Sequence, residues 1–169
     1  MAKKIALALI LLFILSGCTS VLSTSVVQEA DDKISFPELQ RLPDRYRGTV
    51  VILGGQIVET IVKESETWVQ VLQLPLGAQQ RPDNTASSQG RFIVIYKRFA
   101  DPLVYEKGRK ITVAGVVEGG RVIMLNDRPY NFPLLLERET YLWKKEEYYP
   151  AYGPGPAFQF GIGVGTGRW

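Results

Sequence analysis

Thr67-Trp-Val-Gln-Val-Leu-Gln-Leu74 carries the plainest strand signal in this chain of 169 residues. Its side chains alternate, so that Val69 and Val71 fall on one face while Trp68 and Gln70 fall on the other. Alternation with a period of two is typical of a β-strand that has one face buried. We therefore predict a strand over this stretch.

Four further stretches around it are rich in Val, Ile and aromatic residues, which favour strands. They are residues 49–61, 91–97, 110–118 and 121–125. The polar residues 63–66 would form the hairpin that leads into Thr67. Glu118-Gly119-Gly120 would form the turn before residue 121. Residues 133–142 either extend the last pairing or form a separate strand.

Glycines interrupt two of these expected strands, at Gly54-Gly55 and at Gly115. Glycine inside a strand commonly marks a bulge or a sharp bend. Five or six short strands with such bends predict an all-β fold, namely a small OB-like β-barrel that is closed or partly open. A barrel removes the sheet edges that invite aggregation. A simple antiparallel sandwich is the alternative, because periodicity does not separate the two.

One short N-terminal helix is expected before the barrel. Ser35 can cap it, and Pro43 prevents its continuation. Phe36 and Leu39 lie three residues apart and would face a core. In the connection 100–108, Asp101 precedes a proline and is expected to cap a turn or helix rather than to act in catalysis.

The start of the chain predicts an export signal. Lys3 and Lys4 are followed by the apolar run 5–15 and then by Leu15-Ser16-Gly17-Cys18. The apolar run is well short of the roughly 20 residues that span a bilayer. Cys18 is the single cysteine of the chain, and a thiolate is nucleophilic enough to take a diacylglyceryl group.

This segment resembles the lipobox of bacterial lipoproteins. The resemblance implies that a signal peptidase recognises Leu15, Ser16 and Gly17 and cleaves before Cys18, which would carry covalent diacylglyceryl and N-acyl lipid. Several acyl chains together give stable anchoring. Thr19, rather than Asp, follows the lipidated residue, and by the same resemblance this implies sorting to the outer membrane, with the protein facing the periplasm.

The chain therefore divides into four expected parts. They are a signal peptide at 1–17, a lipidated tether at 18–33, the barrel domain at 34–147 and a flexible tail rich in Gly, Pro and aromatic residues at 148–169. Aromatic side chains of the tail are candidates for stacking on glycan rings or for lying at lipid headgroups. These candidate ligand-binding residues are Tyr148, Tyr149, Tyr152, Phe158 and Trp169.

Composition excludes several classes of site. The chain has no histidine and one cysteine, which rules out Ser-His-Asp and Cys-His catalysis and any zinc, copper or iron site that needs those ligands. Lys3 and Lys4 supply two of its three net positive charges, so the mature chain has 18 basic against 17 acidic residues. No metal is expected, and no cofactor besides the lipid.

Nucleic acid is not expected as a partner of a nearly neutral envelope protein. The closest approach to the pattern of basic and aromatic residues that binds single strands is a group in the third strand and just after it. The group consists of Arg91, Phe92, Tyr96, Lys97 and Arg98.

No catalytic residue is predicted. Gly54-Gly55-Gln56 repeats a tripeptide of peptide-release factors, but here it falls inside a strand, where a bulge explains the glycines better. Paired carboxylates of a glycosidase are conceivable, yet the acids lie in polar, turn-like surroundings. These acids are Glu64, Glu66, Asp83, Asp101 and Asp127.

Short motifs spread in order over residues 36–143 resemble the Slp family of outer-membrane lipoproteins. They include Tyr46-x-Gly48, Gly54-Gly55-x-Ile57, Gly90-Arg91-Phe92, Asp101-Pro102-x-x-Tyr105-x-x-Gly108-Arg109 and Tyr130-Asn131-Phe132-Pro133. The resemblance implies an outer-membrane lipoprotein with an OB-like body, and it implies no reaction.

We therefore expect a non-catalytic structural or binding module of the cell envelope, held by its acyl chains in outer-membrane lipid. A link to stress or starvation comes from the resemblance alone. An envelope protein or a glycan would be the partner. The alternatives are an adaptor or stabiliser of an envelope complex and, third, a hydrolase acting on glycan or peptidoglycan.

Overall fold

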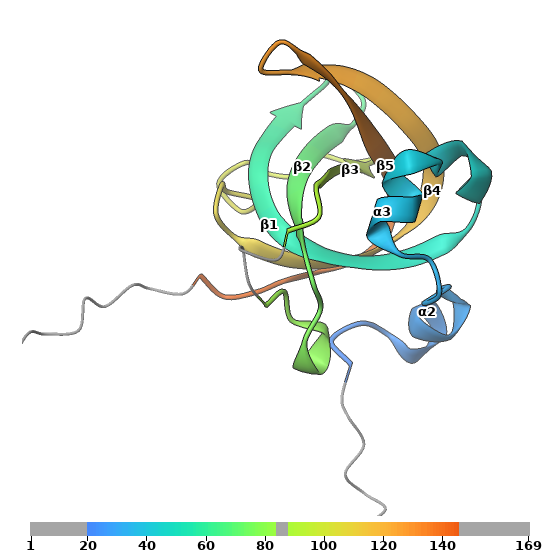
Figure 1. The fold of residues 1–169 in the computed structure, drawn as a ribbon. Coiled ribbons are helices and arrows are strands. Elements are labelled where there is room, and N and C mark those ends of the chain that lie inside the picture. The colour runs from blue at the N-terminus through green and yellow to red at the C-terminus, as the bar shows by residue number, and fades with distance from the viewer. Residues whose placement is uncertain (1–19, 84–87, 146–169) are drawn as a thin grey trace, which may run out of the picture.

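The computed structural model describes residues 20–83 and 88–145 and shows a barrel of five strands (Figure 1). The strands are β1 Val50–Val62, β2 Thr67–Leu74, β3 Arg91–Tyr96, β4 Lys110–Leu125 and β5 Arg128–Leu142. They close in the order β1-β2-β3-β5-β4. β3 and β5 run parallel, whereas the other pairs are antiparallel. The predicted OB-like barrel is confirmed, and the sandwich is excluded.

The interior of the barrel is the main hydrophobic core. Val69 and Val71 share the buried face of β2, as the alternation predicts. The predicted inner face of β3 is also confirmed, because Phe92, Val94 and Tyr96 are fully buried in the same core. Side chains thus fill the barrel, which leaves its outer surface to bind ligands.

Helix α3, Phe36–Arg41, covers one end of this core. Its Phe36 and Leu39 are buried, and the Phe36 ring lies 6.1 Å from the ring of Phe92. Ser35 holds the N-cap position without a side-chain hydrogen bond. A 3₁₀-helix, η1 Pro43–Tyr46, follows directly, so the predicted helix and its end near Pro43 are confirmed.

The turn expected at Glu118-Gly119-Gly120 is not formed, and β4 runs through it as one strand of 16 residues. Side chains at Gly119 and Gly120 would overlap Arg47 and Pro43, so the glycines let η1 pack closely. The turn lies instead at Asn126 and Asp127, which have positive φ angles of 49° and 61°, as a tight hairpin requires. The resulting β4–β5 hairpin extends well past the barrel (Figure 1).

The two expected glycine bends have different outcomes. The register of β4 shifts between Ala114 and Gly115, so the bend at Gly115 is confirmed. In β1 the shift lies between Ile57 and Glu59, and not at Gly54-Gly55. A side chain at Gly55 would overlap the Leu72 carbonyl oxygen of β2, so this glycine permits close strand approach.

Replacing Gly55 with alanine is therefore expected to destabilise the barrel by about 1–3 kcal/mol or more, because the added carbon meets backbone. Gln56→Ala is the matched control, since it removes one 2.9 Å hydrogen bond to the Gly108 carbonyl, worth about 0.5–1.5 kcal/mol. Urea unfolding followed by circular dichroism measures both changes. Equal losses of stability in the two variants would contradict the close strand approach assigned to Gly55.

The segment before α3 was expected to be an irregular tether, but residues 20–33 pack against the barrel. They include a second helix, α2 Thr24–Glu29. Leu22 is buried, the Ser23 amide donates to Glu139, and the Asp31 amide donates to the Val50 carbonyl. Two short helices therefore stand where one was predicted.

Two connections complete the described chain. Residues 75–83 hold the short 3₁₀-helix η2 Ala78–Gln80. After β3, the Asp101 carboxylate accepts a 2.8 Å hydrogen bond from the Leu103 amide. This contact gives Asp101 the turn-capping role that the sequence predicts. Among the described residues, no helix is long and apolar enough to cross a membrane.

Candidate functional site

A second apolar cluster lies on the outside of the barrel, over β2, β3 and β5. Its buried members are Trp68, Ile93, Ile95 and Phe132. Ile123, Tyr130, Leu134 and Leu136 pack against them and are partly exposed. In OB-folds, the face of strands 2 and 3 together with the loops joining strands 1–2 and 4–5 binds ligands. The cluster occupies this position.

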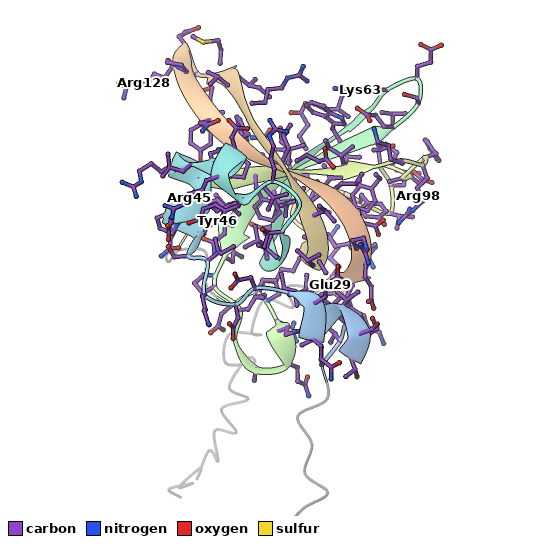
Figure 2. The ribbon with its side chains drawn as sticks, turned by 90° about the vertical axis from the view of Figure 1, so that its right-hand side faces the viewer. Glu29, Arg45, Tyr46, Lys63, Arg98 and Arg128 are labelled. Carbon is purple, nitrogen blue, oxygen red and sulfur yellow. The ribbon has the colours of Figure 1, made fainter. Side chains whose placement is uncertain are left out.

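Two hairpins rise on either side of the cluster, and we call them the arms. The first arm joins β1 to β2 and the second joins β4 to β5. Lys63 on the first arm and Arg128 on the second diverge at the top of Figure 2, whereas Glu29 of α2 lies at the opposite, lower side. The space between the arms therefore opens away from the N-terminal segment.

A cavity of about 100 Å³ lies at the base of the two arms, and we call it the notch. Its walls are mostly apolar. They consist of Ile61, Trp68, Gln70, Ile93, Ile123, Met124, Leu125 and Phe132. The side chains of Ile61 and Met124, one on each arm, are 42% and 62% exposed. A small apolar group can thus enter from solvent and be enclosed on both sides.

Gln70 is the polar residue of the notch. Its amide nitrogen is buried and has no hydrogen-bond partner among the described residues. An unsatisfied buried donor costs about 1–3 kcal/mol of stability. A ligand that offers a carbonyl or another acceptor at this point would satisfy the donor. Gln70 therefore indicates a site that is completed by a bound group.

Replacing Gln70 with leucine is expected to raise the free energy of unfolding by about 1 kcal/mol, because the unsatisfied donor is removed. Gln56→Leu is the matched control, since the Gln56 amide already donates to the Gly108 carbonyl and its loss is expected to destabilise. Urea unfolding measures both variants. A Gln70→Leu protein that is less stable than the wild type would contradict the destabilisation that we assign to this unsatisfied amide.

Charged side chains hold Trp68 in place at the floor of the notch. Its indole nitrogen donates to Glu66 at 2.5 Å, and Lys97 donates to the same carboxylate at 2.6 Å. These two hydrogen bonds, that of Lys97 first, hold the pKa of Glu66 below its usual value. The Lys63 ammonium lies 3.1 Å from the centre of a Trp68 ring, and the Arg121 guanidinium lies 5.1 Å from it.

A larger hollow of about 350 Å³ continues from the cluster toward η1. Apolar side chains of β3 and β5 line one part of it. Its charged lining residues are Arg47, Lys97, Arg121 and Glu118. With Lys63 over Trp68, basic groups outnumber acidic ones around the apolar cluster. This surface therefore favours a partner that combines an apolar side chain with acidic neighbours.

The residues that the sequence singled out for nucleic acid do not form such a surface. Phe92 and Tyr96 are fully buried in the core, so neither ring can stack on a base. Burial raises the pKa of the Tyr96 hydroxyl, which lies 3.0 Å from the Thr140 hydroxyl. Arg98 pairs with Glu137.

The other sites considered from the sequence were a metal site, the lipobox and the aromatic tail. Among the described residues, no acids gather into a group that could hold a metal ion. The lipobox, Thr19 and the tail aromatics lie outside the described residues, so their roles stay predictions.

Sequence reasoning missed the notch. Its one signal was that β3 carries apolar residues on both faces, with Ile93 and Ile95 opposite Phe92.

Comparison with known proteins adds a relationship over most of the chain. The profile of the "Outer membrane lipoprotein Slp family" matches residues 15–165. The outer membrane protein Slp of Escherichia coli K12 is 29% identical over 145 residues, which cover 85% of this chain and 77% of that protein. An uncharacterised protein of Haemophilus influenzae is 34% identical over 94 residues, which cover 55% of this chain and 51% of that protein.

Among solved structures, the mitochondrial single-stranded DNA binding protein Rim1 of S. cerevisiae is similar to part of the chain. Its sequence identity is 14% and its TM-score 0.36, over 57% of this chain and 95% of that one. At that TM-score the similarity supports no inference about a ligand.

Proposed function

The chain belongs to the Slp family of outer membrane lipoproteins, and from this premise we propose that it is a non-catalytic binding module of the cell envelope. Acyl chains on Cys18 would hold it in the outer membrane, with the barrel in the periplasm. Its partner would be an envelope protein, bound in the notch. The link to starvation stress rests on the family resemblance alone.

The observation that carries this proposal is the unsatisfied amide of Gln70 in an exposed apolar notch. A peptide offers the matching chemistry, namely an apolar side chain next to a backbone carbonyl. Basic residues around the notch add attraction for acidic side chains of the same partner. Partly exposed apolar centres with a polar rim are typical of protein interfaces.

The lining of the notch also supports binding rather than catalysis. Its side chains are apolar apart from one amide, and neither kind transfers protons near neutral pH. The Glu66 carboxylate beside Trp68 already accepts hydrogen bonds from Trp68 and Lys97. An adaptor in an envelope complex would use the same notch, so one experiment addresses both functions.

The test places a photo-crosslinking amino acid at Met124 or at Ile61 in living cells. Leu42, 40% exposed and outside the notch, is the matched control position. We expect the same protein to be crosslinked from both arms and not from Leu42. An absence of products from both arms, or equal products from all three positions, would contradict the proposed function.

A further inference from the structure

The first described residue shows how close the barrel must lie to the lipid anchor. The Ser20 hydroxyl donates a 2.7 Å hydrogen bond to the Gln80 side chain of η2. The next residues stay bound to the barrel through Leu22 and Ser23. One residue, Thr19, lies between Cys18 and Ser20, and each of the two steps along the chain spans at most about 3.6 Å. An anchor at Cys18 would therefore leave the barrel no room to move far from the bilayer.

A continuous set of contacts leads from this point to the end of β5. The Thr112 hydroxyl donates to the Gln80 carbonyl at 2.6 Å and accepts a 3.0 Å hydrogen bond from the Trp143 indole. The Arg81 guanidinium lies 5.1 Å from the Trp143 ring. The surface around Trp143 is thus fixed relative to the anchor.

Basic residues gather at this corner of the barrel. Lys110, Lys144 and Lys145 line a shallow hollow of about 220 Å³ together with the polar Gln56 and Gly108. Lys144 and Lys145 are exposed, and Lys145 pairs with Glu106 at 3.0 Å. Lys144 forms no ion pair with another described residue, so its positive charge remains at this corner. Phosphate groups of a membrane surface have the complementary charge.

An apolar tip lies next to the lysines, on the connection between β3 and β4. Leu103 is 85% exposed and Phe99 is 66% exposed, the highest exposures among the large hydrophobic residues that the structure describes. Arg109 joins this tip to the corner, because its guanidinium donates to the Val104 carbonyl at 2.8 Å and to the Trp143 carbonyl at 3.0 Å.

We propose that this corner of the barrel rests on the bilayer, with Phe99 and Leu103 in the headgroup region and with Lys110, Lys144 and Lys145 beside lipid phosphates. The inference rests on the acylation of Cys18 proposed above. Exposed apolar residues flanked by lysines bind membrane interfaces through both burial and charge.

The membrane fits this surface better than a protein does, because the anchor already brings it there. Docking also orients the molecule. η2, to which Ser20 is hydrogen-bonded, lies at the bottom of Figure 1, and the β4–β5 hairpin lies at the top. A docked corner would keep the notch turned away from the bilayer and accessible to a partner.

The test uses the full chain, isolated as the lipoprotein and placed in vesicles of phosphatidylethanolamine and phosphatidylglycerol. Acylation would block the sulfur of Cys18, so Leu103→Cys introduces the one reactive thiol for a fluorophore. Val122→Cys is the matched control, since Val122 is 65% exposed on the β4–β5 hairpin. Nitroxide-labelled lipid then quenches whichever fluorophore lies near the membrane.

We expect quenching at Leu103 to be several-fold stronger than at Val122, and to fall when Lys144 and Lys145 are both replaced with glutamate. Equal quenching at the two positions would overturn the docking while leaving the anchor intact. A wild-type chain that takes up the thiol label would overturn the anchor and with it this inference. Binding at the notch is measured separately, by the crosslinks from Met124 and Ile61.

Discussion

Replacing Phe92 with alanine is expected to lower the free energy of unfolding by about 3–5 kcal/mol. Phe92 is fully buried in the barrel and packs against Phe36 of the helix that covers its end. The substitution removes the transfer energy of a large side chain and leaves a cavity between the two elements. The total free energy of unfolding of a small domain is about 5–15 kcal/mol. The expected loss is therefore a large share of the stability of the protein.

Phe99→Ala provides the matched control for this change. The same side chain is removed, but from a position that is 66% exposed, where substitutions usually change stability by less than about 0.5 kcal/mol. Urea unfolding followed by far-ultraviolet circular dichroism measures both proteins. Similar midpoints for the two variants would show that the barrel interior is not the core that holds this fold.

Introducing glutamate at Ile61 is expected to reduce partner capture by at least about tenfold, because the new negative charge meets the apolar and acidic groups of the partner. A buried charge without a partner costs more than the roughly 1.4 kcal/mol that a tenfold change requires. Ile61 is 42% exposed on the first arm, so the unbound protein can hold the new charge in solvent. The loss of partner capture would then come from the charged side chain in the notch and not from unfolding of the barrel.

The yield of crosslinks from a photo-crosslinking residue at Met124 measures this effect. Leu42→Glu, with the same charge at a position of similar exposure outside the notch, serves as control. Thermal unfolding of each variant establishes that the barrel is intact. Wild-type yield from the Ile61→Glu protein would exclude the notch as the binding site, since a bound apolar side chain cannot share so small a cavity with a charge.

Local patterns in the sequence were enough to predict most of the barrel. β2 begins and ends at the predicted residues, and β3 differs by one residue at its end. The faces were also predicted correctly, because a side chain in a strand alternates regardless of its neighbours. α3 followed from Ser35 at its N-cap position, its two apolar residues and Pro43, although the Ser35 side chain forms no capping hydrogen bond. These signals depend on residues near one another in the chain.

The predictions that failed concern contacts between distant segments. Gly119-Gly120 has the composition of a turn, but its glycines make room for η1, more than 70 residues earlier. Helix α2 has six residues and none is buried, so it is too short to be stable alone. Its flanking residues bind β5 and β1 through Glu139 and Val50. A local sequence pattern does not show such contacts with distant strands.

The sequence by itself determined most of the strands, their buried faces and, through the order of its motifs, the family. The pairing of distant strands decided between a barrel and a sandwich. Only the tertiary structure decided where a partner can bind. The notch combines Ile61, Trp68, Ile93 and Met124 from four different strands. Gln70 becomes significant only because its surroundings bury the amide nitrogen, which has no hydrogen-bond partner among the described residues. Periodicity records which side of a strand is apolar, whereas a binding site depends on which strands come together.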